Sequence, residues 1–293
     1  MASVYGSQRD GSGRDDGRNI GDVEVDTLGL PIRATLTNGL HVELDFFRPA
    51  PDSDELSRAY EEFNAVIEEG TTWPFENRFE SEAQFRSYFC SHAAFVLRAN
   101  SAMAPAGEIV GFFYIKPNYP GRCAHFCNGG FVTVPAFRRQ GAAILMTTHF
   151  LALAKTLGYR AVQFNLVFAT NHASQCLWRR LRFREIGVLP RVGRLKLVDR
   201  EKHDKQDQAR HRFNARRWML DGDCIFQDIK HSPNPTSLVD ATMYYYDLTQ
   251  HDPSTFKPLE MWQVRLQGAR RLVARHALAA VCVSLLLMCR LRS

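Results

Sequence analysis

Strand-like and helix-like hydrophobic patterns alternate through the middle of this chain, from Ala94 to Leu189. Short runs rich in Val, Ile and Phe predict strands, and longer runs with apolar residues three or four positions apart predict helices. Such alternation is typical of an α/β or α+β domain, in which helices cover one shared sheet. The chain of 293 residues is long enough to bury the core of such a domain.

The patterns assign each expected element to a residue range. Ser53 or Asp54 is the expected N-cap of the first helix, and Gly70 is its expected end. Gly129 and Gly130 lie inside a strand pattern, which indicates a bulge or a close approach of the backbone to a ligand. The expected strands are 42–47, 94–98, 108–116, 128–134, 162–168, 185–189 and 241–247, and the expected helices are 54–70, 80–90, 139–157 and 173–181.

Composition separates a globular body from segments of different character. The apolar fraction of 45% and the charged fraction of 23% exclude wholesale disorder. No apolar run reaches the roughly 18–20 residues that a membrane-spanning helix needs. We expect residues 1–25 to be a disordered tail, residues 26–250 to be one domain with a basic insertion at about 194–236, and residues 251–293 to be a tail with a short apolar helix.

The net charge of +6 is concentrated in two segments, so the rest of the chain is net acidic. Arg191 to Arg217 holds ten Lys or Arg against four Asp or Glu, and Val264 to Ser293 holds six Arg and no acid. Such segments attract nucleic acid, anionic lipid or an anionic cofactor, although a solvated charge run is the simpler interpretation. Aromatic residues are sparse in the insertion, which argues against nucleic acid as a partner.

The apolar stretch Ala277–Cys289 lies between Arg275 and Arg290 and is short for a membrane span. A helix on the membrane surface, a partner-binding helix and a short tail anchor all remain open for it.

The seven cysteines are odd in number and irregularly spaced, and no secretory leader opens the sequence. These features predict free thiols and a cytoplasmic location, with the nucleus or a tail-mediated membrane association as alternatives.

A metal site is not predicted. Cys123, His125 and Cys127 alternate along the chain as zinc ligands can, but no second cluster supplies the remaining ligands. Packing of the loop that leads into Asn128 explains these residues better.

The segment from Arg138 to Ala143 has the composition of an anion-binding turn. It follows an expected strand and opens an expected helix, and residues Gly141 to Ala143 are small. Small residues let a ligand approach the backbone, and the free N–H groups at a helix start attract negative charge. With Arg138 and Arg139 beside it, this turn is a candidate pyrophosphate site, although a plain strand–turn–helix connection has the same pattern.

Three blocks carry a family resemblance. The first is Arg138-Arg-Gln-Gly-Ala-Ala143, the second is Gly111-Phe-Phe-Tyr-Ile-Lys-Pro-Asn-Tyr119 continuing to Asn128-Gly-Gly-Phe131, and the third is Phe164-Asn-Leu-Val-Phe-Ala-Thr-Asn171. Together they resemble the GNAT acetyltransferase superfamily, and within it the yeast enzymes that acetylate the proline analogue L-azetidine-2-carboxylate. The same blocks also resemble the acetyltransferase domain of an activator of histone genes. The resemblance implies a mixed, mostly antiparallel sheet that is splayed around acetyl-CoA and flanked by helices.

The resemblance also implies site residues and a homodimer. Asn128, Phe131 and Asn165 would line the acceptor site, and Asn171 would hold the pantetheine arm, although an asparagine at a helix start also serves as an N-cap. Asn128, Asn165 and Asn171 are the candidate catalytic residues. The implied acetyl-CoA contacts are Val132, Thr133, Val134, Arg138, Arg139, Gln140, Gly141, Ala142, Ala143, Asn171 and Ser174.

The implied chemistry is direct attack of a neutral nitrogen on the thioester, with acetyl-CoA as co-substrate and no metal. It requires placement of the two reactants and donors for the carbonyl oxygen. Trp178 occupies the position where many members carry a tyrosine acid, and an indole cannot donate a proton usefully. The expected acceptor is a small amino or imino acid that resembles proline. Acetylation of protein or histone lysines, and a regulatory protein that binds DNA or a partner through the basic insertion, are the alternatives.

Overall fold

A single mixed sheet organises the computed structural model, which describes residues 28–100, 107–196 and 236–252. Its strand order is β1-β2-β3-β4-β5-β6-β8-β7, and within the described residues only β5 and β6 run parallel. The strands are β1 (Ile32–Thr35), β2 (His41–Phe46), β3 (Ala93–Ala99), β4 (Ile109–Pro117), β5 (Phe126–Thr133), β6 (Ala161–Phe168), β7 (Arg184–Lys196) and β8 (Thr236–Asp247), and the helices are α1 (Asp54–Glu69), α2 (Glu82–Phe89), α3 (Ala142–Thr156) and α4 (His172–Arg180).

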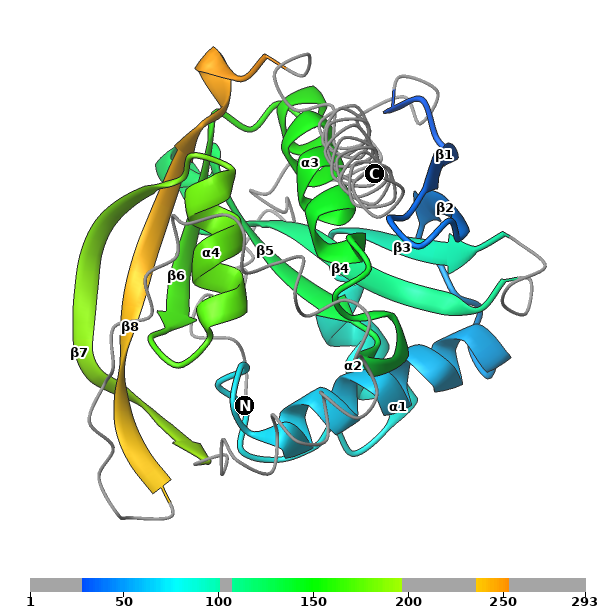
Figure 1. The fold of residues 1–293 in the computed structure, drawn as a ribbon, viewed down its shortest axis with the longest axis horizontal. Helices are drawn as coiled ribbons and strands as arrows, with labels where there is room; N and C mark the ends of the chain where they lie inside the picture. The colour runs from blue at the N-terminus through cyan, green and yellow to red at the C-terminus, as the bar shows by residue number, and fades with distance from the viewer. Residues whose placement is uncertain (1–27, 101–106, 197–235, 253–293) are drawn as a thin grey trace, which may run out of the picture.

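The helices cover both faces of the sheet, as Figure 1 shows. Successive strand residues point to opposite faces of a sheet. The contacts of the neighbours Phe112 and Phe113 of β4 therefore show which helices cover each face. The ring of Phe112 lies 5.1 Å from Phe89 of α2, and the ring of Phe113 lies 6.0 Å from Phe150 of α3. α1 and α2 therefore cover one face, while α3 and α4 cover the other. This arrangement confirms the expected mixed, mostly antiparallel sheet with flanking helices.

Aromatic rings form the core between the sheet and α1 and α2. Phe63 of α1 is fully buried, and its ring lies 4.7 to 6.3 Å from six others, which are Trp73, Phe75, Phe79, Phe85, Tyr88 and Phe89. Trp73 and Phe75 belong to the loop between α1 and α2, so the same cluster that fixes the helices also holds this loop against the sheet.

The end of β7 is tied to the end of α1. The N–H of Lys196 donates to the carbonyl of Gly70 at 2.9 Å, and its Nζ donates to the carbonyl of Glu68 at 2.7 Å. Arg194 forms an ion pair with Glu76 in the loop that follows. The far end of the β7–β8 pair is thereby held beside the loop that carries Trp73.

β5 and β6 pair over a very short length. Only Phe126↔Ala161 and Cys127↔Val162 are in register, and beyond them the two strands part. β6 continues its pairing with β8, and β5 continues its pairing with β4. The sheet therefore opens next to Asn128 on β5 and Gln163 on β6. This confirms the expected splay.

Several expected elements have different bounds. The helix expected from Arg139 begins at Ala142, because Arg139 and Gly141 both have positive φ, at 62° and 91°. β7 runs to Lys196 and β8 starts at Thr236, so the ends of the expected insertion at 194–236 are strand, held by cross-strand pairing that its polar sequence does not signal. β1 was not expected from the sequence. Most of the insertion and both tails lie outside the described residues.

The capping prediction for the first helix is correct. Ser53 precedes α1, and its side chain accepts a hydrogen bond from the N–H of Leu56, while Gly70 ends the helix with φ 67°.

Among the described residues, no helix is both long and apolar enough to cross a membrane.

The prediction for Gly129 and Gly130 was partly wrong. These residues form no bulge, since β5 stays in register with β4 through both. A Cβ on Gly129 would lie 2.5 Å from the Phe150 ring, and one on Gly130 would lie 2.4 Å from the Trp73 ring. Both glycines are therefore needed because aromatic rings approach the strand from its two faces.

We predict that Gly130→Ala lowers the free energy of unfolding by about 1–3 kcal/mol, because the new methyl group would overlap Trp73 and Tyr114. Urea denaturation would measure the change. Gly187→Ala is the matched control, since its Cβ would meet only the flexible end of Met243, and we expect about 0.5 kcal/mol or less there. Equal losses of unfolding free energy in the two variants would contradict the explanation that aromatic rings require glycine at position 130.

Candidate active site

The turn before α3 is held in place by the hairpin between β1 and β2. The carbonyl of Gln140 accepts from the N–H of Thr37 at 3.1 Å and from its Oγ1 at 2.9 Å. The side-chain Oε1 of Gln140 accepts from Asn38 at 2.7 Å. Gly141 then starts α3 with φ 91°. The first N–H groups of α3, at Ala142 and Ala143, have no side-chain cap.

The two arginines of this turn differ in placement. Arg138 is engaged by protein groups, because its guanidinium contacts both carboxylate oxygens of Glu69, at 2.8 and 3.1 Å, and the carbonyl of Thr133 at 3.3 Å. Arg138 thus links α1 to the turn. Arg139 is exposed and has a positive φ of 62°. The sequence pattern assigned both side chains to a pyrophosphate site. In the structure, Arg138 instead forms an ion pair with Glu69.

β5 offers a free backbone edge where it leaves β6. The N–H of Val134 donates to Val110 on β4 at 3.1 Å. Ladder bonds alternate along an antiparallel strand, so Val132 also bonds to β4, while the backbone groups of Phe131 and Thr133 point toward the opened side. The sequence assigned the whole stretch from Val132 to Val134 to the cofactor arm. Of that stretch, the ladder leaves only the backbone of Thr133 facing the opened side, and the carbonyl of Thr133 accepts from Arg138.

Asn171 caps α4. Its Oδ1 accepts from the N–H of Ser174 at 3.2 Å, so the N-cap alternative is realised, and its Nδ2 takes no part in that bond. Trp178 is buried in the aromatic core, with its ring 4.4 Å from Phe164 and 5.7 Å from Phe131. The indole N–H meets no acceptor within the described residues, and the ring serves packing.

A row of polar side chains lies on the α1/α2 face of the sheet, beside the opening between β5 and β6. We call it the polar row. In an antiparallel pair, residues in register share a face, so Lys116 of β4 and Asn128 of β5 stand side by side there. The alternation along β6 puts Gln163 and Asn165 on the face opposite the aromatic ring of Phe164. The members of the row are Lys116, Asn118, Asn128, Gln163 and Asn165.

Hydrogen bonds fix Asn165 within the polar row. Its Nδ2 donates to Oδ1 of Asn118 at 2.6 Å, and its Oδ1 accepts from Asn118 and from Gln163, both at 3.1 Å. Gln163 also donates to the hydroxyl of Tyr119 at 2.6 Å. Asn118 is buried while Asn165 is half-buried. Those bonds use one of the two Nδ2 hydrogens of Asn165, so a second N–H can donate to a ligand.

Asn128 has a similar capacity. Its Oδ1 accepts from the N–H of Gly129 at 2.8 Å, which leaves its Nδ2 as a donor. Phe131, which the sequence grouped with Asn128 and Asn165, points to the opposite face and packs against Phe150 at 5.1 Å. The alternation of side chains along β5 separates it from the two asparagines. Its side chain belongs to the core, and the grouping was wrong in this respect.

Lys116 lies next to two tyrosines. Its Nζ is 4.0 Å from the ring centre of Tyr88 and 4.1 Å from that of Tyr114, and it donates to the carbonyl of Tyr88. Burial lowers the pKa of Lys116 to about 7, and burial also raises the pKa of both tyrosines, whose hydroxyls are 3.1 Å apart. The tyrosines are therefore neutral at physiological pH, and the lysine is close to its midpoint.

The residues considered for zinc lie in different environments. Cys127 is fully buried in the core, and burial raises the pKa of its thiol, whereas Cys123 and His125 are exposed. Within the described part of the chain, no group of three or more His, Cys, Asp or Glu side chains could hold a metal ion.

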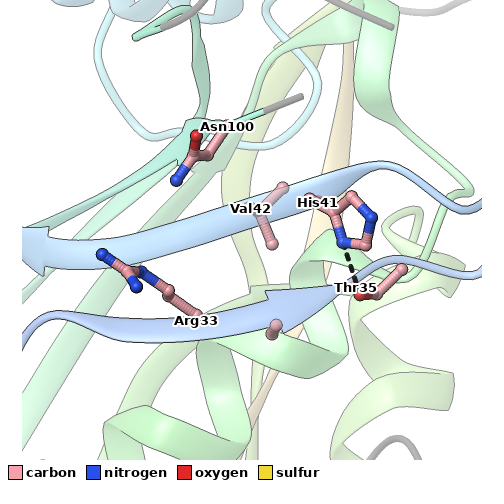
Figure 2. Close-up of a pocket in the computed structure, with 6 residues that line it drawn as sticks. Arg33, Thr35, His41, Val42 and Asn100 are labelled. Atoms are coloured by element: carbon pink, nitrogen blue, oxygen red, sulfur yellow. Dashed lines mark hydrogen bonds between the residues drawn. The ribbon is translucent and has the colours of Figure 1, made fainter. Parts of the chain in front are cut away.

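A separate hollow lies at the sheet edge, as Figure 2 shows. Among its polar groups, Thr35 Oγ1 and His41 Nδ1 are 2.9 Å apart, and Arg33 contacts Glu43 at 3.1 Å. β3 and β4 separate it from β5, so it is distinct from the opening between β5 and β6. The residues that line it are Arg33, Ala34, Thr35, His41, Val42 and Asn100.

Within the described residues, the sheet parts at its one parallel pair of strands, beside a helix that starts at glycine, as expected of the GNAT fold. The family model described as the acetyltransferase (GNAT) family matches residues 56–183. The N-acetyltransferase aca1 of Schizosaccharomyces pombe is 36% identical over 178 residues, which cover 57% of this chain and 85% of that protein. The chain belongs to the GNAT acetyltransferase family and is an acetyl-CoA-dependent N-acetyltransferase.

Two further similarities concern a shorter stretch of sequence and the fold. Protein SPT10 of Saccharomyces cerevisiae is 35% identical over 100 residues, which cover 34% of this chain and only 16% of that protein. The structure of a GCN5-related N-acetyltransferase from Kribbella flavida has a TM-score of 0.50 and 20% identity, and the match covers 70% of this chain and 97% of that chain. The similarity to the Kribbella flavida structure supports the fold.

Sequence reasoning missed the roles of Asn118, Gln163 and Lys116. A signal was present for two of them, because Lys116 stands in a strand and Asn118 directly after it, and both residue types are depleted in strands. The register that aligns Lys116 with Asn128 and brings Asn118 to Asn165 could not be read from the sequence.

We predict that Asn118→Ala lowers the free energy of unfolding by about 1–3 kcal/mol, because it removes both bonds between Asn118 and Asn165 at a buried position. Chemical denaturation would measure the loss. Gln84→Ala removes an exposed amide that accepts from the N–H of Glu80, and about 0.5 kcal/mol or less is expected. A loss at Asn118 no larger than that at Gln84 would mean that the amide pair does not fix Asn165.

Proposed function

We propose that this enzyme transfers the acetyl group of acetyl-CoA to the nitrogen of a small amino or imino acid, with proline-like compounds first among the acceptors. The observation that carries the proposal is the polar row. It places two amide donors, from Asn128 and Asn165, at the point where β5 and β6 part. A small acceptor with a carboxylate suits such a set of donors.

The residues near α3 fit acetyl-CoA. The uncapped N–H groups at Ala142 and Ala143 would hold the pyrophosphate, and Gln140 and Gly141 shape their turn. The outward N–H and carbonyl of Phe131 and the N–H of Thr133 would bond to the pantetheine arm as an added strand does. Nδ2 of Asn171 and the side chain of Ser174, at the start of α4, would contact the same arm. The cofactor would thus fill the opening that the parting of the strands creates.

The two asparagines would act as donors rather than as bases. An amide cannot remove a proton at physiological pH, but its N–H can stabilise an oxygen that gains negative charge. In the reaction the nitrogen lone pair forms the C–N bond, and the C–S bond breaks with its electron pair going to sulfur. The proton lost by the nitrogen balances the proton gained by the sulfur. Trp178 takes no part in that transfer because its ring is buried in the core.

A thiol-release assay with a panel of acceptors tests the proposal. The panel contains azetidine-2-carboxylate, proline, hydroxyprolines, polyamines and a histone-tail peptide. We expect turnover on one or more cyclic imino acids. Turnover on the peptide alone would contradict the proposal and favour acetylation of protein lysines. Turnover on none of them, with acetyl-CoA binding intact, would also reject this acceptor class.

We predict that Asn165→Ala and Asn165→Asp each lower kcat/KM for the best imino acid about 10²-fold, because both remove the N–H donor from the reacting oxygen. The aspartate variant keeps acceptors for the Gln163 and Asn118 amides, but it sets a carboxylate oxygen against Oδ1 of Asn118, so we expect it to lose stability as well. Thermal melting of each variant serves as the control for folding. Wild-type kinetics in a folded Asn165→Asp variant would remove Asn165 from the mechanism.

We predict that Gly141→Ala raises the Kd for acetyl-CoA about tenfold, since alanine disfavours the φ of 91° that starts α3 and its Cβ would come within 3.1 Å of Thr37. Titration calorimetry would give the Kd. Gly107→Ala is the matched control, because Gly107 has a φ of 81° but open space around it in the turn between β3 and β4. An unchanged Kd for Gly141→Ala would place the pyrophosphate elsewhere.

A further inference from the structure

The polar row contains one cation, Lys116, and the proposed chemistry does not use it. It stands beside Asn128 in a hydrogen-bonded register pair, on the same face as Asn165. Its side chain is half-buried, with Nζ above the faces of Tyr88 and Tyr114. The ammonium is thus positioned by a strand, a helix and two rings rather than by a mobile surface segment.

Lys116 has no anionic partner within the described residues. Its Nζ donates to one acceptor, the carbonyl of Tyr88, and no carboxylate lies within ion-pair distance of it. A half-buried ammonium normally pairs with an anion, because removal from water is costly for an isolated charge. An aromatic ring compensates only in part. The position is therefore suited to an anionic group that arrives from outside.

We propose that Lys116 is the anion-binding residue of the acceptor site and receives the carboxylate of the amino or imino acid. This inference rests on the proposed function, since it identifies how that site selects its substrate. The carboxylate and the nitrogen of such an acid are separated by one carbon atom. A carboxylate at Lys116 would therefore hold the nitrogen beside Asn128, next to the opening that receives the thioester.

The same arrangement discriminates between acceptor classes. Lys116, Asn128 and Asn165 all present N–H donors, so an oxygen anion is complementary to them and an ammonium group is not. A histone tail or a polyamine brings only positive charge to this face. Free amino and imino acids bring a carboxylate, and Lys116 would therefore favour them.

The charge of Lys116 makes carboxylate binding depend on pH. Burial depresses its pKa to about 7, so the ammonium is present below pH 7 and is lost above it. The titratable groups that face it are Tyr88 of α2, Tyr114 of β4 and Cys90 at the end of α2, and burial raises the pKa of all three, that of Cys90 to about 11. These neighbours stay neutral from pH 6 to 9, as the raised pKa values require. Binding of a carboxylate should weaken above pH 7.

The first experiment compares azetidine-2-carboxylate with its carboxamide in the thiol-release assay. We expect Lys116→Met to lower kcat/KM for the acid about 10- to 100-fold and to change kcat/KM for the amide less than about twofold, since only the acid loses a charged contact. Lys155→Met is the matched control, because Lys155 also donates to a backbone carbonyl, that of His251, and lies at the far end of α3. We expect it to leave both substrates unchanged.

The second experiment needs no turnover. Cyclobutanecarboxylate has no nitrogen, and its binding to the CoA-loaded protein can be measured by calorimetry from pH 6 to 9. We expect the wild-type Kd to rise about tenfold per pH unit above pH 7, as the loss of one proton requires. In Lys116→Met the Kd should be high at every pH, and in Lys116→Arg it should stay low up to pH 9 because arginine keeps its charge.

The outcomes separate this inference from the proposed function. Turnover of acid and amide with equal losses in Lys116→Met would overturn the role of Lys116 while the proposed function stands. A wild-type Kd that is independent of pH, or no binding of cyclobutanecarboxylate, would overturn it as well. Binding that depends on Lys116 without turnover of any acid would support the carboxylate site and reject the proposed reaction.

Discussion

The parting of β5 and β6 is the constraint on which the rest of the structure depends. Two register pairs join these strands, and then each strand follows its other neighbour, β4 or β8. Rings on the α3/α4 side fill the region where they diverge, with Phe131 and Phe164 6.1 Å apart and Trp178 in contact with both. Trp178 of α4 thus packs against residues of both strands in the region where they separate.

The opening brings two different surfaces to one place. On one side the glycine-started turn of α3 and the outward backbone groups of β5 form an edge suited to the phosphate and amide groups of acetyl-CoA. On the α1/α2 face the polar row presents donors from β4, β5 and β6. Thioester and acceptor would approach from opposite sides of the sheet and meet where the strands separate. Such a geometry favours direct transfer, since it needs no covalent enzyme intermediate.

The polar row joins amides that fix one another to a lysine whose charge burial controls. Asn118 is buried and holds Asn165 through two amide hydrogen bonds, so one amide of the network orients another. Lys116 is kept close to its titration midpoint by burial between aromatic rings, a state that makes its charge sensitive to what binds beside it. The aromatic cluster around Phe63 supports both effects, because it positions Tyr88 and the loop that carries Trp73.

The sequence by itself determined the class of fold, most strands and helices, the caps of α1 and the turn before α3, because these follow from local periodicity and from residues with special backbone preferences. The family resemblance of its motifs also implied Asn128 and Asn165 as site residues, in agreement with the rarity of asparagine in strands. Only the tertiary structure decided that Phe131 faces the core, that Arg138 pairs with Glu69, and that Lys116 stands beside Asn128. Those facts depend on strand register and on contacts between distant segments, which no local pattern encodes.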